Sequence, residues 1–219
     1  MSSHPDLQSA DEVVLRMNRV LHEQEQQLCQ YSVHRRYALR NHHLDQETTM
    51  EVLMKYDAGS GKRFTVIGAQ HPGAVSQRVF KNVMDAEQAA STEHPPRAEI
   101  NSQHYTFSLN GIEMRNGRRC YRIGLKPRER TKYLLDGVAW IDTTEFALVR
   151  VEGYCARTVS FWIGRPLFQQ DYEKFGRFWL PSHHRSVAHV KLVGEAELQI
   201  DYSDYQIPPS VLSDSASSR

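Results

Sequence analysis

The sequence GSGKR at residues 59–63 has the composition of a phosphate-binding loop and is the first candidate for chemistry in this 219-residue chain. A nucleotide-binding P-loop needs a glycine five residues before its Gly-Lys pair, and Ser or Thr directly after the lysine. Tyr56 and Arg63 stand at those two positions. The spacing therefore excludes a P-loop and predicts a glycine-rich turn between two strands.

Histidines, serines and carboxylates form no pattern typical of a metal site or a catalytic centre. The His-His pairs at 42–43 and 183–184 place neighbouring side chains on opposite faces of a strand, so neither pair readily chelates one ion. The sequence has no HExxH motif and no GxSxG elbow. A dispersed nucleophilic triad stays open, because its members need not be adjacent. We expect no catalytic residue, no metal ligand and no cofactor, and hence a protein that is not an enzyme.

A basic segment at residues 118–132 carries seven cationic side chains against one acid, Glu129. A cationic stripe on one strand face could bind lipid headgroups or an acidic partner surface. The alternative is a solvated sheet face whose cations pair with carboxylates across strands. With two arginines from an earlier strand, the candidates for contact with a headgroup or a protein partner are Arg35, Arg36, Arg118, Arg122, Arg128 and Arg130.

A second candidate set consists of flexible or aromatic apolar side chains on faces that are expected to point inward. Methionine and aromatic linings suit adaptable apolar cavities. They also suit an ordinary core, and both interpretations remain open. The expected lining residues of an apolar cavity are Met50, Val52, Met54, Phe64, Val66, Phe80, Met84, Phe107 and Trp140.

Two helices and a long series of strands must position these residues. Ser9 and Glu12 have the spacing of a capping box, and a helical stripe of apolar residues follows them. The same period returns over residues 73–90. Alternating patterns predict strands at 31–39, 48–56, 64–69, 105–109, 121–125, 158–163, 175–180, 183–192 and 195–205, with a further meander at 132–153.

Two dipeptides predict the tight turns of β-hairpins. Asn116-Gly117 and Asp136-Gly137 are both favoured where a turn needs φ > 0. Within the meander, Asp136-Gly137 is expected to join two strands, and Trp140 is expected in the middle strand.

The order of elements predicts an α+β fold, because helices and strands are segregated rather than alternating. A sheet of about 10–11 strands curls strongly. We therefore expect a strongly curved antiparallel sheet that forms an unclosed half-barrel, with the two helices covering its open face. One domain is expected over residues 9–207, between a disordered N-terminus, 1–8, and a disordered tail, 208–219.

Composition narrows the function classes. With 27 basic and 26 acidic residues, the net charge of +1 gives no general attraction to nucleic acid or anionic membrane. No apolar run approaches the ~20 residues of a transmembrane helix. Three cysteines without a CxxC pair argue against a disulfide scaffold or a cysteine-based zinc site. We expect Cys29, Cys120 and Cys155 to be buried thiols, with one disulfide as the alternative.

Three segments together resemble the LolA-like superfamily of outer-membrane lipoprotein-sorting and lipid-handling proteins. At residues 9–39 a short helix enters the first strand. Residues 121–153 contain a lysine-proline step, a turn and a strand with the letters WID, and residues 175–207 resemble the superfamily's closing hairpins. The resemblance covers residues 9–207.

The resemblance implies an open barrel with helices as a lid over an apolar cavity, and binding without chemistry. It implies a periplasmic protein whose export signal has been removed, because the polar N-terminus lacks the apolar region of a signal peptide. The expected partners are lipid or lipoprotein acyl chains held between sheet and helices. The alternative is an envelope sensor or a module that binds a protein partner.

Overall fold

The computed structural model describes residues 9–41, 46–71, 73–91, 99–158, 164–191, 194–209 and 211. The expected disordered N-terminus, the His42-His43 pair, most of the strand expected at 158–163 and most of the expected tail lie outside the described residues. The elements in chain order are α1 Ala10–Gln27, β1 Gln30–Asn41, β2 Gln46–Asp57, β3 Gly61–Gln70, α2 Ala74–Ala90, β4 Tyr105–Arg115, β5 Arg118–Pro127, β6 Leu135–Asp142, β7 Leu148–Cys155, β8 Leu167–Phe175, β9 Phe178–Val190 and β10 Gly194–Gln206.

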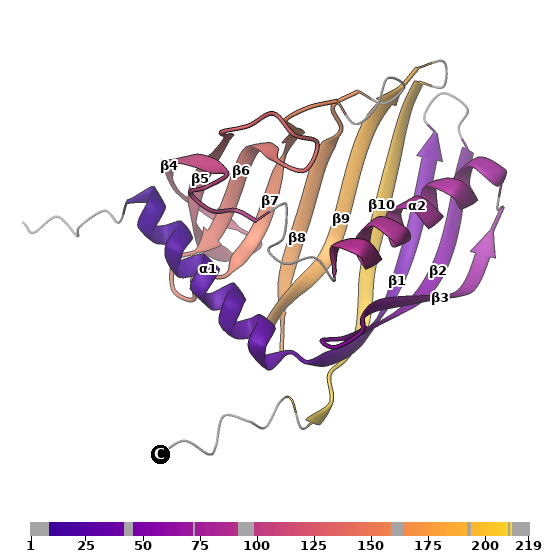
Figure 1. Cartoon of the computed structure of the whole chain (residues 1–219), viewed down its shortest axis with the longest axis horizontal. Coiled ribbons are helices and arrows are strands. Elements are labelled where there is room, and N and C mark those ends of the chain that lie inside the picture. The colour runs from indigo at the N-terminus through magenta and orange to yellow at the C-terminus, as the bar shows by residue number, and fades with distance from the viewer. Residues whose placement is uncertain are drawn as a thin grey trace, which may run out of the picture.

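The ten strands of the described residues form one sheet in the order β3-β2-β1-β10-β9-β8-β7-β6-β5-β4 (Figure 1). Every pairing is antiparallel, and the final strand β10 lies beside β1, with Tyr37 opposite Ile200. The first and last strands of the described chain are therefore neighbours inside the sheet. β3 and β4 stand at opposite edges and do not pair with each other in the described structure. The expected α+β fold with an unclosed antiparallel sheet is confirmed.

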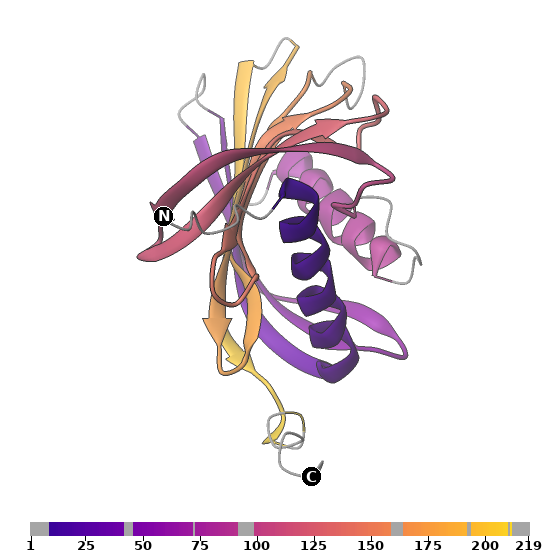
Figure 2. The same cartoon turned by 90° about the vertical axis from the view of Figure 1, so that its left-hand side faces the viewer.

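Both helices lie on the same side of the sheet, which curves toward them (Figure 2). We call this side the helix-bearing face and the opposite side the outer face. α1 buries Val13 and Met17 in a cluster with Ile123 and Ile141, which belong to β5 and β6. α2 packs over the other half of the sheet, on side chains from β1, β2 and β10. The helices thus divide the helix-bearing face between them.

Local sequence signals explain several of the boundaries. The Ser9 hydroxyl accepts a hydrogen bond from the Glu12 amide at 3.1 Å and caps α1, as the spacing predicted. At residues 57–61 the chain turns as expected, because Asp57 Oδ1 accepts from the amides of Gly59 and Ser60, both at 3.0 Å. Asn116 and Gly117 both adopt positive φ and join β4 to β5, which confirms this hairpin.

The turn expected at Asp136-Gly137 is wrong, because both residues lie inside β6. Gly137 stands opposite Gly153 of β7. A Cβ atom on Gly137 would come within 2.1 Å of the Glu152 carbonyl oxygen. The glycine is therefore needed for the close approach of two strands rather than for a turn, and the chain reverses after Asp142 instead.

Candidate ligand-binding cavity

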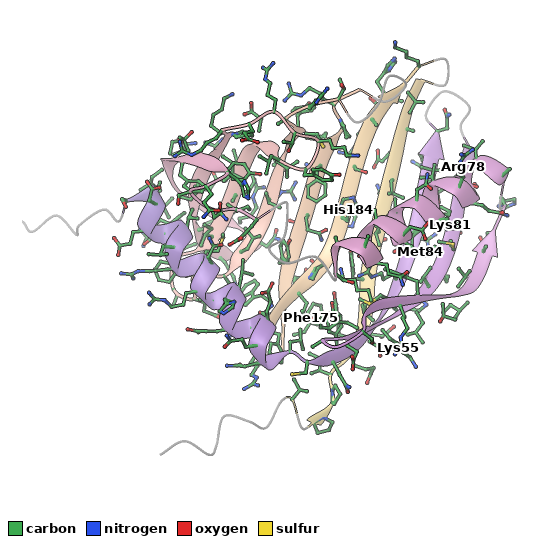
Figure 3. The ribbon with its side chains drawn as sticks, viewed as in Figure 1. Lys55, Arg78, Lys81, Met84, Phe175 and His184 are labelled. Atoms are coloured by element: carbon green, nitrogen blue, oxygen red, sulfur yellow. The ribbon has the colours of Figure 1, made fainter. Side chains whose placement is uncertain are left out.

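A cavity of about 500 Å³ opens on the helix-bearing face, between α2 and the central strands. Its size falls within the range of about 300–1,000 Å³ that is typical of small-molecule sites. Figure 3 shows His184, one of its lining residues, on β9 in the part of the sheet between the two helices. Apolar lining residues include Val83, Phe168, Pro181, Leu198 and Ile200, and polar lining residues include Tyr31, Arg35, Lys62, Glu87, Gln170, Tyr172, His184, Ser186 and Tyr202.

Arg35 is the buried charge of this cavity. Strand alternation in β1 places it on the helix-bearing face between Val33 and Tyr37, where it is only 2% exposed. A buried charge is costly unless it is paired and hydrogen-bonded. Glu87 of α2 supplies the pair, because Arg35 Nη1 lies 2.9 Å and 3.1 Å from its two carboxylate oxygens. This ion pair joins α2 to the middle of the sheet.

Aromatic rings and hydroxyls surround the Arg35 guanidinium. Its carbon lies 4.7 Å from the centre of the Tyr202 ring and 5.5 Å from that of Phe64, within the range of cation–π attraction. Nη1 also lies 3.4 Å from the Tyr37 hydroxyl. Burial by itself lowers the pKa of Arg35, but Glu87 and the tyrosines raise it above its ordinary value. Arg35 is therefore charged throughout the physiological range.

A second cation shares the same carboxylate. Lys62 Nζ, from β3, lies 3.2 Å from Glu87 Oε2, and both side chains are about a quarter exposed. Burial raises the pKa of Glu87, but the charges of Arg35 and Lys62 outweigh it and hold that pKa below its ordinary value. The cluster thus contains two positive charges and one negative charge at neutral pH.

The Arg35 side chain is not fully satisfied. Its Nε is buried and has no hydrogen-bond partner among the described residues. Leaving a buried donor unpaired costs about 1–3 kcal/mol, and more for a charged group. Arg35 lines the cavity, and a ligand oxygen atom that reached its Nε would recover this cost.

The remaining polar groups of the wall are neutral. Burial lowers the pKa of His184 to about 4, and the imidazole packs edge-on to Phe168 with 4.8 Å between ring centres. Burial also raises the pKa of Tyr31 and of Tyr172 to about 12. These groups are able to form hydrogen bonds with a ligand without adding charge to the site.

Five of the nine apolar residues expected to line a cavity pack together where α2 contacts the sheet. They are Met50, Val52, Phe64, Phe80 and Met84. Figure 3 shows Met84 on α2. The five fill the space between α2 and the strands β1, β2 and β10 as a core, and the cavity opens beside them.

The other four expected lining residues lie apart. Met54 is fully buried on the same face of β2, and Phe107 packs against the cluster under α1. Val66 is 52% exposed on the edge strand β3. Trp140 lies on the outer face, because it alternates with Ala139 and Ile141 of the α1 cluster. None of the nine is among the residues that line the described cavity, and their contact with a ligand stays a prediction.

Of the six expected headgroup or partner arginines, only Arg35 lines the cavity. Arg36 points to the outer face and lies 3.5 Å from Glu51. Arg128 donates from Nε to the carbonyls of Ser102 and Tyr105, at 2.9 Å and 3.1 Å, and so ties down the chain before β4.

The three remaining arginines are also outside the cavity. Arg130 is exposed. Arg122 lies opposite Trp140 in the β5–β6 pairing. Arg118 stacks over Trp179 at 4.6 Å and pairs with Asp142 and Glu145, at 3.0 Å and 3.1 Å. Arg118, and Lys126 with Asp136 at 2.7 Å, follow the expected alternative of cations paired across strands.

Sequence reasoning missed Lys62, Glu87, His184 and Tyr202. One signal was available for Glu87, which follows Phe80 and Met84 along the buried side of α2 at helical spacing. Arg35 similarly interrupts the apolar side of β1. A charge on each of two otherwise buried faces, with opposite signs, indicates a pair. The partners from β3, β9 and β10 could be assigned only once the strand order was known.

Three further findings concern the described residues: metal ligands, membrane-spanning helices and cysteines. Among them, no group of three or more His, Cys, Asp or Glu is placed to hold a metal ion. In the same ranges, neither helix is long and apolar enough to cross a membrane. Cys29 is exposed, contrary to expectation, whereas Cys120 and Cys155 are buried, and all three are free thiols.

Comparisons with known sequences give one family. The family model described as "Family of unknown function (DUF5686)" matches residues 40–204. This range includes Lys62, Glu87 and His184, and Arg35 lies just before it. A search of curated proteins found no match.

Among solved structures, three similar chains come from bacteria. A putative outer membrane lipoprotein-sorting protein domain from Vibrio parahaemolyticus is 12% identical, with 89% of this chain and 93% of that chain covered and a TM-score of 0.48. A LolA superfamily protein from Nitrosomonas europaea is 15% identical, covering 94% and 98%, with a TM-score of 0.45. A DUF1329 family protein from Desulfovibrio piger is 13% identical, covering 94% and 97%, with a TM-score of 0.48. The expected resemblance to the LolA-like superfamily is found, and it carries no information about the ligand.

Proposed function

The chain belongs to the DUF5686 family, and we propose that it binds an amphipathic molecule with an acyl or similar apolar chain in the cavity beside α2. It holds and releases this molecule without changing it. The proposal rests on one observation above all. The cavity combines an apolar wall with a buried, charged arginine whose Nε has no partner among the described residues.

The apolar wall accounts for the chain of the ligand. Phe168 comes from β8, Leu198 and Ile200 come from β10, and Val83 comes from α2. Each 100 Å² of apolar surface that a ligand buries there contributes about 2.5 kcal/mol of transfer free energy. The two helices serve as a cover over the open side of the half-barrel, and α2 is the part that must yield when a ligand enters.

The setting we propose is the periplasm, where such a protein carries lipid or lipoprotein acyl chains. Acyl chains that cross an aqueous compartment need a protein that covers them, because the free-energy cost of their exposure to water grows with their apolar area. A neutral surface suits a carrier that must not bind any one membrane tightly, and the net charge is +1.

Native mass spectrometry of the purified protein, before and after lipid extraction, tests the proposal. We expect adducts with the masses of acyl-chain compounds, and displacement of a fluorescent fatty acid by dodecanoate. The variant Ser186→Phe places a ring in the cavity and should abolish displacement. Ser203→Phe makes the same change at an exposed position on β10, outside the cavity lining, and should bind normally. Equal binding by both variants would place the ligand elsewhere.

A second candidate function is the recognition of an envelope protein. The edge strand β3 exposes Val66 and Ile67, and the nearby start of α2 exposes Val75. An exposed edge can accept an extended segment of another chain by strand addition. This candidate requires one envelope protein that is captured by the wild type, identified by mass, and lost with Ile67→Lys. Retention of the same protein by Ile67→Lys would refute it.

A further inference from the structure

We propose that the cavity selects amphiphiles whose headgroup carries a single negative charge, and that Glu87 sets this selection. The inference rests on the proposed function and adds the charge of the headgroup and the direction in which the ligand lies. The headgroup contacts Arg35 at the inner wall, and the chain extends along the apolar wall. Glu87 acts as a specificity residue, because it cancels one of the two cations.

The charge count follows from the contacts. Arg35 and Lys62 both contact the Glu87 carboxylate, at 2.9 Å and 3.2 Å, so one positive charge is left over. In the described part of the chain, the other titratable groups that line the cavity are neutral at pH 7. Burial lowers the pKa of His184 and raises the pKa values of Cys155 and of the lining tyrosines. One negative charge on the ligand therefore completes the balance.

The position of the headgroup follows from the unpaired donor. Glu87 occupies Nη1 of Arg35 with both of its oxygens, and Nε is left without a partner among the described residues. The Tyr202 ring lies over the guanidinium, so an incoming oxyanion must approach along the guanidinium edge. Nitrogens along that edge bind carboxylate or phosphate oxygens through strong charge-assisted hydrogen bonds.

A second negative charge on the ligand is unfavourable in this cavity. Arg35 is almost completely buried, and an uncompensated charge in such surroundings is costly. A neutral headgroup is also disfavoured, because it leaves the surplus positive charge unbalanced. Fatty acid carboxylates and phosphodiesters share the required chemistry. A phosphate monoester is mostly a dianion above its second pKa of about 6 and does not fit.

The test compares four probes with the same twelve-carbon chain at pH 7.5: dodecanoate, dodecyl methyl phosphate, dodecyl phosphate and dodecanol. Isothermal titration with the wild type should give the two monoanions an affinity about tenfold higher than the other two, the value of one charged hydrogen bond. Preference between dodecanoate and dodecyl methyl phosphate then identifies the natural source as a carboxylate or a phosphodiester. Equal affinity for all four probes would overturn the inference.

Variants of the cluster formed by Arg35, Lys62 and Glu87 provide the second part of the test. Glu87→Gln leaves two positive charges and should make dodecyl phosphate the best ligand, by about tenfold over its wild-type affinity. Lys62→Gln leaves a neutral cluster and should remove the preference for dodecanoate over dodecanol. Glu51→Gln is the matched control, because Glu51 pairs with Arg36 on the outer face, and its probe ranking should equal that of the wild type.

The outcomes separate the two proposals. An unchanged ranking in folded Glu87→Gln and Lys62→Gln would refute the role of Glu87 while leaving ligand binding intact. Binding of none of the four probes by the wild type would refute the proposed function and this inference together. Circular dichroism of each variant shows which proteins are folded, and Lys62→Gln alone decides the question if Glu87→Gln does not fold.

Discussion

Two clusters on opposite faces of the sheet contain the same kinds of side chain but differ in net charge. Each has an arginine on an aromatic ring, a second cation and at least one carboxylate. On the outer face, Arg118 stacks on Trp179 and pairs with Asp142 and Glu145. Lys174 also pairs with Glu145, so two cations meet two anions. On the helix-bearing face, Arg35 stacks on Tyr202 and shares one carboxylate with a second cation. The charges of the outer cluster cancel, whereas the cluster on the helix-bearing face keeps one positive charge.

Exposure, net charge and unpaired donors distinguish a structural ion pair from a candidate binding site. Arg118 is 35% exposed, so water satisfies what its protein partners do not. Arg35 is buried, keeps a surplus positive charge around it, and has an Nε donor without a partner among the described residues. Charge imbalance and an unsatisfied donor in a cavity wall are costs to the folded protein. A ligand that removes those costs gains affinity from them.

The largest effect is expected from Arg35→Met. This change leaves Glu87 with Lys62 alone, and removal of one partner of a buried pair costs about 3–5 kcal/mol. We expect about 3 kcal/mol, since Glu87 is a quarter exposed. Urea unfolding measures the stability, and dodecanoate titration should show lost binding. A loss of less than about 1 kcal/mol in the free energy of unfolding, with normal dodecanoate binding, would contradict this prediction. Arg35 would then behave like an exposed structural arginine.

A pH effect of up to about 3 kcal/mol is expected at His184. Its pKa is about 4 in the folded protein against an ordinary value of 6.5, so the unfolded chain binds more protons between these values. Stability should therefore fall as pH is lowered from about 7 to about 4. Urea unfolding at several pH values should show a shallower fall for His184→Gln. Parallel curves would contradict the burial of a neutral imidazole.

Arg118→Met should have a smaller effect than Arg35→Met, although it breaks two ion pairs. Arg118 is 35% exposed, so solvent screens its side of the pairs, and the buried Asp142 keeps the amides of Thr144 and Glu145 as donors. We therefore expect a loss of about 1–2 kcal/mol in urea unfolding. Dodecanoate affinity should stay at the wild-type value. A change in affinity would show that the outer cluster also takes part in binding.

The smallest effect is expected on the rates at which two buried thiols are chemically modified. Cys155 lines the cavity, whereas Cys120 belongs to the outer-face cluster around Trp140. Burial raises the pKa of both thiols, so both react slowly. In a Cys29→Ser background, dodecanoate should slow the modification of Cys155 several-fold and leave Cys120 unchanged, as peptide mass mapping would show. Equal protection of both thiols would indicate general tightening instead.

Sequence patterns were sufficient for the architecture because they are local. The Ser9 cap, the Asn116-Gly117 hairpin and the alternation of Val33, Arg35 and Tyr37 each depend on a few neighbouring residues. The turn predicted at Gly137 was wrong because this glycine allows a close approach to Gly153, which lies sixteen residues later in the sequence. A close approach between strands and a tight turn both require glycine, and the sequence alone does not distinguish them.

The site was harder to predict than the fold because its members come from distant segments. Arg35 was among the candidates, but its partner Glu87 lies on α2 and His184 lies on β9. The meeting of β1 with β10 in mid-sheet decides which side chains share the cavity. Trp140 and Met50 both looked inward from the sequence, yet they lie on opposite faces, since a strand pattern does not say which of two buried faces carries the helices.

The most direct test of ligand binding at Arg35 is a crystal structure of the protein with 12-bromododecanoate, with the bromine located by anomalous scattering. We predict one carboxylate oxygen within hydrogen-bond distance of Arg35 Nε, and the bromine among Phe168, Leu198 and Ile200. A ligand found on the outer face, or one whose carboxylate lies in solvent with Arg35 Nε still unpaired, would contradict binding at Arg35.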